Sequence, residues 1–246
     1  MSDALTRLYG VIEATWPPAA IKELGPFALR DGAGGGKRVS SATVEGATTA
    51  DDLPVAERAM QAMGQAPLFM IRKGDDALDA LLAAQGYDII DPVNIYACPV
   101  GDLAKCDLPR VTSFSIWEPL AIMRDIWAQG GIGPERVAVM ERAKGPKTGL
   151  FGRHDNRPAA TGFVAIHDGT AMVHAIEVLA RDRRQGVGRH LMIQAARWAE
   201  QRGADQIAVI CTQANAGANA LYASLGMRLV GHYHYRIKGR PAHEPR

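Results

Sequence analysis

One segment in the second half of the chain restricts its fold more than any other. Residues 172–180 have the composition of a strand, residues 181–189 carry four arginines and two glycines, and residues 188–201 have the apolar spacing of a long helix. Glycines let a ligand approach the backbone closely, and the free N–H groups of a first helical turn point toward it. With the helix dipole and the arginines, this arrangement predicts a helix start that binds a diphosphate. A tight turn without a ligand is the alternative.

The surrounding pattern predicts an α/β domain over residues 109–246. Strands are expected at residues 111–115, 148–153, 159–166, 172–180, 206–212 and 228–237, and helices at 119–129, 134–144, 188–201 and 216–225. We expect the last residues, 240–246, to form a frayed tail.

The apolar pattern of the first half, residues 1–108, predicts a second and smaller α/β domain. Helices are expected at residues 5–15, 53–63 and 76–85, and strands at 26–31, 38–44, 67–72 and 87–100, the last one bent at Pro92. A polar stretch then ends at Pro109, so we place the domain boundary between residues 108 and 109.

A weak internal repeat relates the two halves. Residues 67–90 align with residues 207–230 at a constant offset of 140, which is 226 minus 86 for the two glycines. In both segments a strand leads to a helix rich in Ala and Leu, then to a glycine and another strand. The matched positions are Asp75, Ala80, Leu81 and Gly86 in the first half and Asn215, Ala220, Leu221 and Gly226 in the second. The repeat predicts a common architecture for the two halves.

Two short motifs give the second half a family resemblance. Residues 183–188 (RRQGVG) resemble the R/Q-x-x-G-x-G/A signature of the GNAT acyltransferase family, and they lie between the fourth strand and the third helix, as in that family. Residues 215–227 (NAGANALYASLGM) resemble its second signature, N-x-x-A-x-x-L-Y-x-x-x-G-F, with Met227 in place of Phe. The resemblance covers roughly residues 111–238. It implies an α/β fold with a mixed, mostly antiparallel sheet and helices on both faces.

The resemblance also implies how acetyl-CoA, the acyl donor of this family, would bind without a metal. The loop at residues 185–189 would hold the pyrophosphate, and arginines beside it would add charge-assisted contacts. The backbone of residues 178–180 would pair with the pantetheine arm like an added strand, and Asn215 would contact the arm from the other side. The implied cofactor-binding residues are Val178, Leu179, Ala180, Arg183, Arg184, Gln185, Gly186, Val187, Gly188, Arg189, Asn215 and Tyr222.

Proton transfer would fall to three candidate side chains. The resemblance implies that Tyr222 lies near the sulfur and protonates the departing thiolate, although Tyr222 could instead be a core tyrosine. Strand alternation places His174 on one face with Ile176 and Val178, and places Glu177 on the other face. His174 resembles a histidine of family members that acetylate arylalkylamines, and its ordinary pKa suits proton removal at neutral pH. Glu177 is the rival base, and a bulge in the strand would change the alternation.

Two further segments of the second half have open roles. The resemblance places Gly130, Gly131 and Gly133, which follow Trp127, where the family builds the wall of the acceptor site; a plain loop between helices is the alternative. The aromatic strand at residues 233–236 could line the same site or simply pack.

The first half lacks this chemistry. Before its helix at residues 53–63 it carries Glu45, Asp51 and Asp52, whose carboxylates would compete with a diphosphate. Leu82 stands at the position that matches Tyr222. The resemblance therefore implies a degenerate copy that has lost coenzyme binding, which is similar to tandem members of the family such as mycothiol synthase.

A glycine-rich segment in the first half looks like a nucleotide-binding P-loop. Residues 32–37 (GAGGGK) are one residue short of that motif, and Arg38 stands where Ser or Thr should bind magnesium. A strand is expected after it rather than a helix. We therefore expect a hairpin turn.

Composition narrows the class of protein. A net charge of +2 and the lack of basic runs with interleaved aromatics argue against a nucleic-acid partner. The amino terminus lacks the layout of a signal peptide, and no apolar run is long enough for a membrane span. The three cysteines follow no metal-ligand spacing, so we expect reduced thiols in a cytoplasmic protein. A homodimer is compatible with these features.

The sequence predicts an N-acyltransferase in which an amine attacks acetyl-CoA directly in a ternary complex. The acceptor, a small molecule or a peptide amine, cannot be identified from these residues. A non-catalytic acyl-CoA sensor and an interaction scaffold without a ligand are the alternatives.

Overall fold

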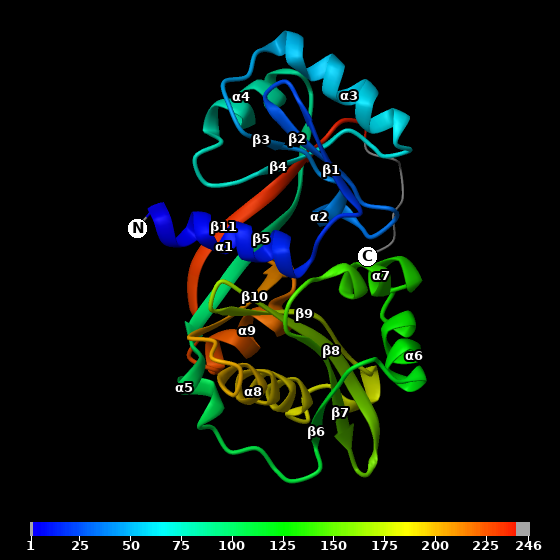
Figure 1. Cartoon of the computed structure of the whole chain (residues 1–246), viewed down its shortest axis with the longest axis vertical. Coiled ribbons are helices and arrows are strands. Elements are labelled where there is room, and N and C mark those ends of the chain that lie inside the picture. The colour runs from blue at the N-terminus through cyan, green and yellow to red at the C-terminus, as the bar shows by residue number, and fades with distance from the viewer. Residues whose placement is uncertain (1, 240–246) are drawn as a thin grey trace. The chain divides into compact units, whose positions relative to one another are not determined.

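The chain forms two compact units. The structure, a computed structural model, describes residues 2–239, with the side chains of residues 4–239 (Figure 1). Unit 1 consists of Met1–Pro17, Ile95–Cys211 and Asn215–Val230, and unit 2 consists of Pro18–Asn94, Thr212–Ala214 and Gly231–Arg246. The predicted frayed tail at 240–246 lies outside the described residues.

Unit 1 contains most of the helices. They are α1 (Ser2–Thr15), α5 (Val100–Ala104), α6 (Ala121–Gln129), α7 (Pro134–Arg142), α8 (Val187–Glu200) and α9 (Ala216–Ser224). Its strands are β6 (Ser113–Ile116), β7 (Lys147–His154), β8 (Arg157–His167), β9 (Thr170–Val178) and β10 (Gln206–Thr212), with parts of β5 (Asp88–Pro99) and β11 (Arg228–Ile237).

The large sheet is mixed and mostly antiparallel, which confirms the predicted fold class. It also contains β4 (Leu68–Ile71), and its strand order is β4-β11-β5-β10-β9-β8-β7-β6. Strands β6 to β9 pair antiparallel, and β10 is parallel to β9. On one face, α8 packs against Leu150, Ala160 and Val173 in a shared core. The helices α1 and α6 contact β8 and β9 through the opposite face, so helices cover both faces as predicted.

The predicted boundary between residues 108 and 109 does not coincide with the division into units. Strand β5 precedes that boundary in the sequence, yet it lies between β10 and β11 in the sheet. The expected strand over residues 87–100 gives way at Val100 to the short helix α5, whose Val100 and Leu103 are buried in one core with Leu191 of α8. Helix α1 also belongs to unit 1. That the first half is a degenerate copy of the second stays a prediction.

Unit 2 combines a small sheet with two covering helices (Figure 1). Its elements are β1 (Ala20–Leu24), β2 (Phe27–Asp31), α2 (Lys37–Ser40), β3 (Thr43–Val44), α3 (Leu53–Ala62), β4 (Leu68–Ile71) and α4 (Asp76–Ala84), with a single 3-10 turn at Ala50–Asp52. The strands β1, β2 and β3 form an antiparallel sheet. The expected strand at residues 38–44 is wrong over residues 38–40, because the short helix α2 follows the glycine turn there.

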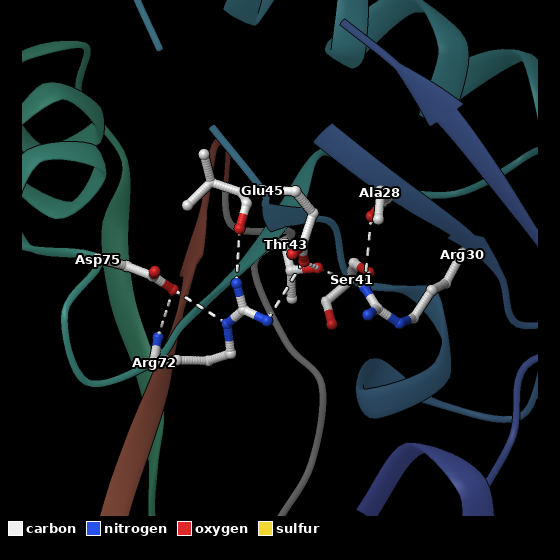
Figure 2. A network of polar contacts seen from close by, with 8 residues as sticks. Ala28, Arg30, Ser41, Thr43, Glu45, Arg72 and Asp75 are labelled. Atoms are coloured by element: carbon white, nitrogen blue, oxygen red, sulfur yellow. Dashed lines mark hydrogen bonds and ion pairs between the residues drawn. The ribbon is translucent and has the colours of Figure 1, made fainter. Parts of the chain in front are cut away.

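Polar side chains tie the strands of unit 2 together (Figure 2). The buried Arg30 donates hydrogen bonds to the carbonyl oxygens of Ala28 and Ser41 and to the hydroxyl of Thr43. Arg72 forms ion pairs with Glu45, at 3.3 Å, and with Asp75, at 3.2 Å. The Glu45 carboxylate therefore has a structural partner.

The internal repeat recurs in the backbone geometry. Asp75 and Asn215 are the N-caps of α4 and α9. Gly86 and Gly226 both have positive φ, at 78° and 76°. After each helix the chain makes the same hydrogen bond: Tyr87 N–H donates to the Leu82 carbonyl oxygen, and Met227 N–H to that of Tyr222. The two strand-helix-strand segments thus share their local structure.

Candidate active site

The predicted diphosphate loop forms between β9 and α8. A 3-10 turn at Ala180–Asp182 follows β9, and Arg184 and Gly186 then take positive φ, at 60° and 78°, before α8 begins at Val187. The residues from Arg183 to Gly186 are exposed. The first N–H groups of α8 have no partner within a helix and therefore remain available to an anion. Ala180 lies in the turn, so the expected strand over residues 172–180 ends two residues early.

Gly188 lets the start of α8 approach two other elements. A Cβ at this position would lie 3.1 Å from Leu221 Cδ2 on α9 and 3.9 Å from Val178 Cγ2 at the end of β9. The structure therefore brings together the end of β9, the loop and α9, which carry most of the predicted cofactor-binding residues.

Asp182 anchors the loop, a role that no motif in the sequence indicated for this residue. Asp182 is buried. Its Oδ1 accepts a hydrogen bond at 3.0 Å from Nδ1 of His154, the last residue of β7. Nearby, burial and the charges of Arg189 and His154 lower the pKa of His190. His190 is therefore neutral at neutral pH, and the arginines supply the positive charge of the loop.

Strands β9 and β10 separate beside this loop. Their pairing ends at Val173 and Val209, although β9 continues to Val178 and β10 continues to Thr212. The β10 register assigns no partner to residues 175–178 of β9, and an exposed strand edge of this kind is the geometry that an added extended chain requires.

A β-bulge changes the alternation of β9. Thr161 pairs with Glu177 and Phe163 pairs with His174, so Gly162 opposes both Ala175 and Ile176. Ala175 has a φ of 51°. After the bulge, Ile176 and Val178 pack in the α8 core with Val173. The predicted alternation is therefore wrong beyond residue 174, and Glu177 shares the face of His174.

His174 is enclosed in the face that α1 covers. It is 3% exposed, and its ring lies 5.0 Å from that of Trp16 and 6.2 Å from that of Phe163. The Thr15 hydroxyl donates its proton to the Val11 carbonyl oxygen at 2.6 Å, so it accepts a hydrogen bond from Nε2 of His174 at 2.9 Å. This environment suits a structural histidine.

Glu177 is more accessible than His174. Its side chain is 20% exposed, and Arg183 donates a hydrogen bond from Nη2 to its Oε1 at 3.3 Å. Arg183 also donates from Nε to the Val178 carbonyl oxygen at 3.1 Å. Gly130 lies against the side chain of Glu177, because a Cβ at Gly130 would be 2.5 Å from the Glu177 carboxyl.

Tyr222 lies in α9 with its ring 5.7 Å from that of Tyr96. It is buried, and burial together with the Cys211 thiol raises the pKa of its phenol. Among the described residues its hydroxyl makes no hydrogen bond, so it is free to meet a ligand. Asn215 caps α9 by accepting a hydrogen bond from Ala218 N–H at 3.0 Å.

The sequence profile of the acetyltransferase (GNAT) family matches residues 119–227. These residues form a GNAT acetyltransferase domain. YobR, an uncharacterized N-acetyltransferase of Bacillus subtilis strain 168, is 27% identical over 246 residues, which cover 96% of this chain and 99% of that protein.

Solved structures of GNAT proteins share the fold of nearly the whole chain. A GCN5-related N-acetyltransferase from Kribbella flavida superposes with a TM-score of 0.71 at 19% identity, covering 96% of each chain. A tandem GNAT protein from the clavulanic acid biosynthesis pathway gives a TM-score of 0.63 at 13% identity, covering 96% of this chain and 89% of that one.

The GNAT domain also uses a residue from before the predicted boundary. The hydroxyl of Tyr96, on β5, donates to Oδ1 of Asn219 at 2.9 Å, and Asn219 Nδ2 donates to the Asn215 carbonyl oxygen at 2.7 Å. Tyr96 therefore supports the first turn of α9. Tyr96 could not be identified from the sequence, because its partner Asn219 lies 123 residues away in the chain.

Other predicted features lie outside the GNAT site. Tyr233 and Tyr235 are buried in unit 2, where their rings pack edge to face at 5.5 Å. No group of metal-ligating side chains occurs among residues 4–239, and in the same part of the chain no helix is both long and apolar enough to cross a membrane.

Proposed function

We propose that the GNAT domain transfers an acetyl group from acetyl-CoA to a primary amine by direct attack in a ternary complex. The observation that carries this proposal is the separation of β9 and β10 directly beside an exposed, glycine-containing helix start. The edge of β9 at residues 175–178 suits the amide groups of pantetheine, and the loop suits the diphosphate of the coenzyme. Tyr222 is then close to the end of the arm that carries the thioester.

In the proposed reaction the amine nitrogen attacks the thioester carbonyl carbon. The attacking amine loses a proton to a base, the tetrahedral intermediate breaks its carbon–sulfur bond, and the coenzyme thiolate receives a proton from Tyr222. The raised pKa of Tyr222 keeps its phenol protonated at neutral pH, as a general acid requires. We assign the base to Glu177, since it is partly exposed on the face where His174 is enclosed.

The first test of this proposal combines an amine panel with the variant Tyr222→Phe. Small amines, aminoglycoside-like compounds, amino acids and peptide amino termini are screened by the release of free thiol from acetyl-CoA. We expect turnover with at least one class, and a loss of about 100-fold in kcat for Tyr222→Phe with little change in the Kd of acetyl-CoA. The control Tyr233→Phe changes a buried tyrosine of unit 2 and should leave kcat unchanged. Tight acetyl-CoA binding without any turnover would support the sensor alternative.

A second variant tests the base. Glu177→Gln keeps the size of the side chain but removes the proton acceptor, so we expect kcat/KM at neutral pH to fall about 100-fold. If His174→Gln instead causes this fall in a folded protein while Glu177→Gln retains the wild-type kcat/KM, the base is His174.

A further inference from the structure

The end of helix α6 makes two contacts with β9, one at Ala175 and one at the proposed base, Glu177. Trp127 is fully buried, and its Nε1–H donates a hydrogen bond to the carbonyl oxygen of Ala175 at 2.8 Å. Three residues later Gly130, the C-cap of α6, lies against the side chain of Glu177. The two contacts thus hold residues on either side of Ile176.

The first contact acts on the bulge. A bulge leaves backbone groups of the strand without their regular ladder partners, and buried groups of this kind need a substitute. The Trp127 indole supplies that substitute for the carbonyl of Ala175, the residue with a φ of 51°. Because the bulge reverses the alternation of β9, it also decides on which face Glu177 lies.

The second contact leaves room for the carboxylate. The φ of Gly130 is −85°, which any residue can adopt, so backbone conformation does not explain a glycine here. A Cβ at this position would have Cδ, Cγ and Oε2 of Glu177 as its three nearest atoms, each at 2.5 Å. The observed position of the Glu177 side chain therefore requires a residue without a side chain at position 130.

We propose that Trp127 and Gly130 are positioning residues that set the side chain of Glu177 toward the acceptor amine. The proposal rests on the function proposed above, in which Glu177 is the base. Trp127 fixes the bulge that turns Glu177 to this face, and Gly130 provides the space that the carboxylate occupies. The predicted pantetheine contacts begin at Val178, which lies on the opposite face of β9 and faces Gly188, so we expect the Kd of acetyl-CoA to depend less on these two contacts than kcat does.

The test is a double-mutant cycle between Trp127→Phe and Glu177→Gln. Phenylalanine keeps an aromatic ring but removes the N–H donor, so we expect kcat to fall about 10-fold in the wild-type background and less than 2-fold in the Glu177→Gln background. The Kd of acetyl-CoA should stay within 2-fold of the wild-type value. An equal loss in both backgrounds, or no loss in either, overturns the proposal. Failure of the proposed function is distinguishable, because Glu177→Gln alone would then leave kcat unchanged.

Two matched controls separate positioning from general loss of stability. Trp198→Phe makes the same change at a buried tryptophan of α8, and Gly10→Ala adds a methyl group where no atom lies within 4 Å. Both should retain wild-type kcat, whereas Gly130→Ala should lower kcat about 10-fold with an unchanged Kd for acetyl-CoA. Wild-type kcat in a folded Gly130→Ala variant overturns the role of Gly130.

A measurement on the free protein does not depend on turnover. Amide hydrogen exchange and backbone chemical shifts should change at residues 174–178 in Trp127→Phe and remain unchanged there in Trp198→Phe. Unchanged exchange and shifts at these residues in Trp127→Phe would overturn the proposal that the indole holds the bulge.

Discussion

Replacing Gly188 by Glu should lower the affinity for acetyl-CoA by about 100-fold or more. A Cβ added at this position would lie 3.1 Å from Leu221 Cδ2, so we expect the new side chain to turn away from α9 and toward the exposed loop. Its carboxylate then faces the proposed diphosphate site. Like charges placed in contact cost several kcal/mol, and about 1.4 kcal/mol corresponds to a tenfold change in Kd.

Isothermal titration of acetyl-CoA, with circular dichroism to verify folding, measures this effect. Gly188→Ala should weaken binding only a few-fold, since Leu221 Cδ2 belongs to a flexible side chain that can move. Gln201→Glu places the same charge at the other, exposed end of α8 and should leave the Kd unchanged. Wild-type affinity in a folded Gly188→Glu variant would falsify the assignment of the diphosphate loop.

The loop could be predicted because its determinants are local. Two glycines, a cluster of arginines and the change from strand to helix periodicity all lie within the segment from Glu177 to His190. The same holds for α9, where Asn215 serves as the N-cap and Gly226 ends the helix region with a positive φ. In both places the residue types themselves favour the observed backbone.

The bulge of β9 could not be predicted from alternation. Ala175 is not a residue type that favours positive φ, and the carbonyl of Ala175 is held by Trp127, which is 48 residues away. The polar residues His174 and Glu177 are three positions apart, a spacing that regular alternation assigns to opposite faces. The faces of His174 and Glu177 therefore depended on a tertiary contact.

The extent of the catalytic unit could not be predicted either. Helix α1 and strand β5 were expected at nearly the observed residues, but their partners lie far along the chain. Thr15 contacts His174 across 159 residues, and Tyr96 contacts Asn219 across 123 residues. Local patterns predict that an element forms, whereas its place in a sheet depends on such distant pairs.

Residues 109–246 alone should therefore fail to fold, although they contain both family signatures. This fragment lacks α1, β5 and α5. Its core would lose the partner side chains that these elements bury in unit 1, among them Leu8, Val11, Ile12, Trp16, Ile95, Tyr96, Val100 and Leu103. Each large apolar side chain contributes about 1.5–3 kcal/mol when buried, so the combined loss is as large as or larger than the roughly 5–15 kcal/mol of net stability of a typical domain.

Thermal unfolding of three chains measures this dependence. The full chain should unfold cooperatively and gain stability from acetyl-CoA. A fragment of residues 88–246 regains β5 and α5 but not α1, and it should keep helical structure without a cooperative transition. The fragment of residues 109–246 should show neither cooperative unfolding nor stabilisation by acetyl-CoA. Cooperative unfolding of that shortest fragment, with acetyl-CoA binding intact, would show that the earlier elements are accessories to an independent domain. The expected failure would mean instead that α1 and β5 complete the GNAT sheet and its acceptor face.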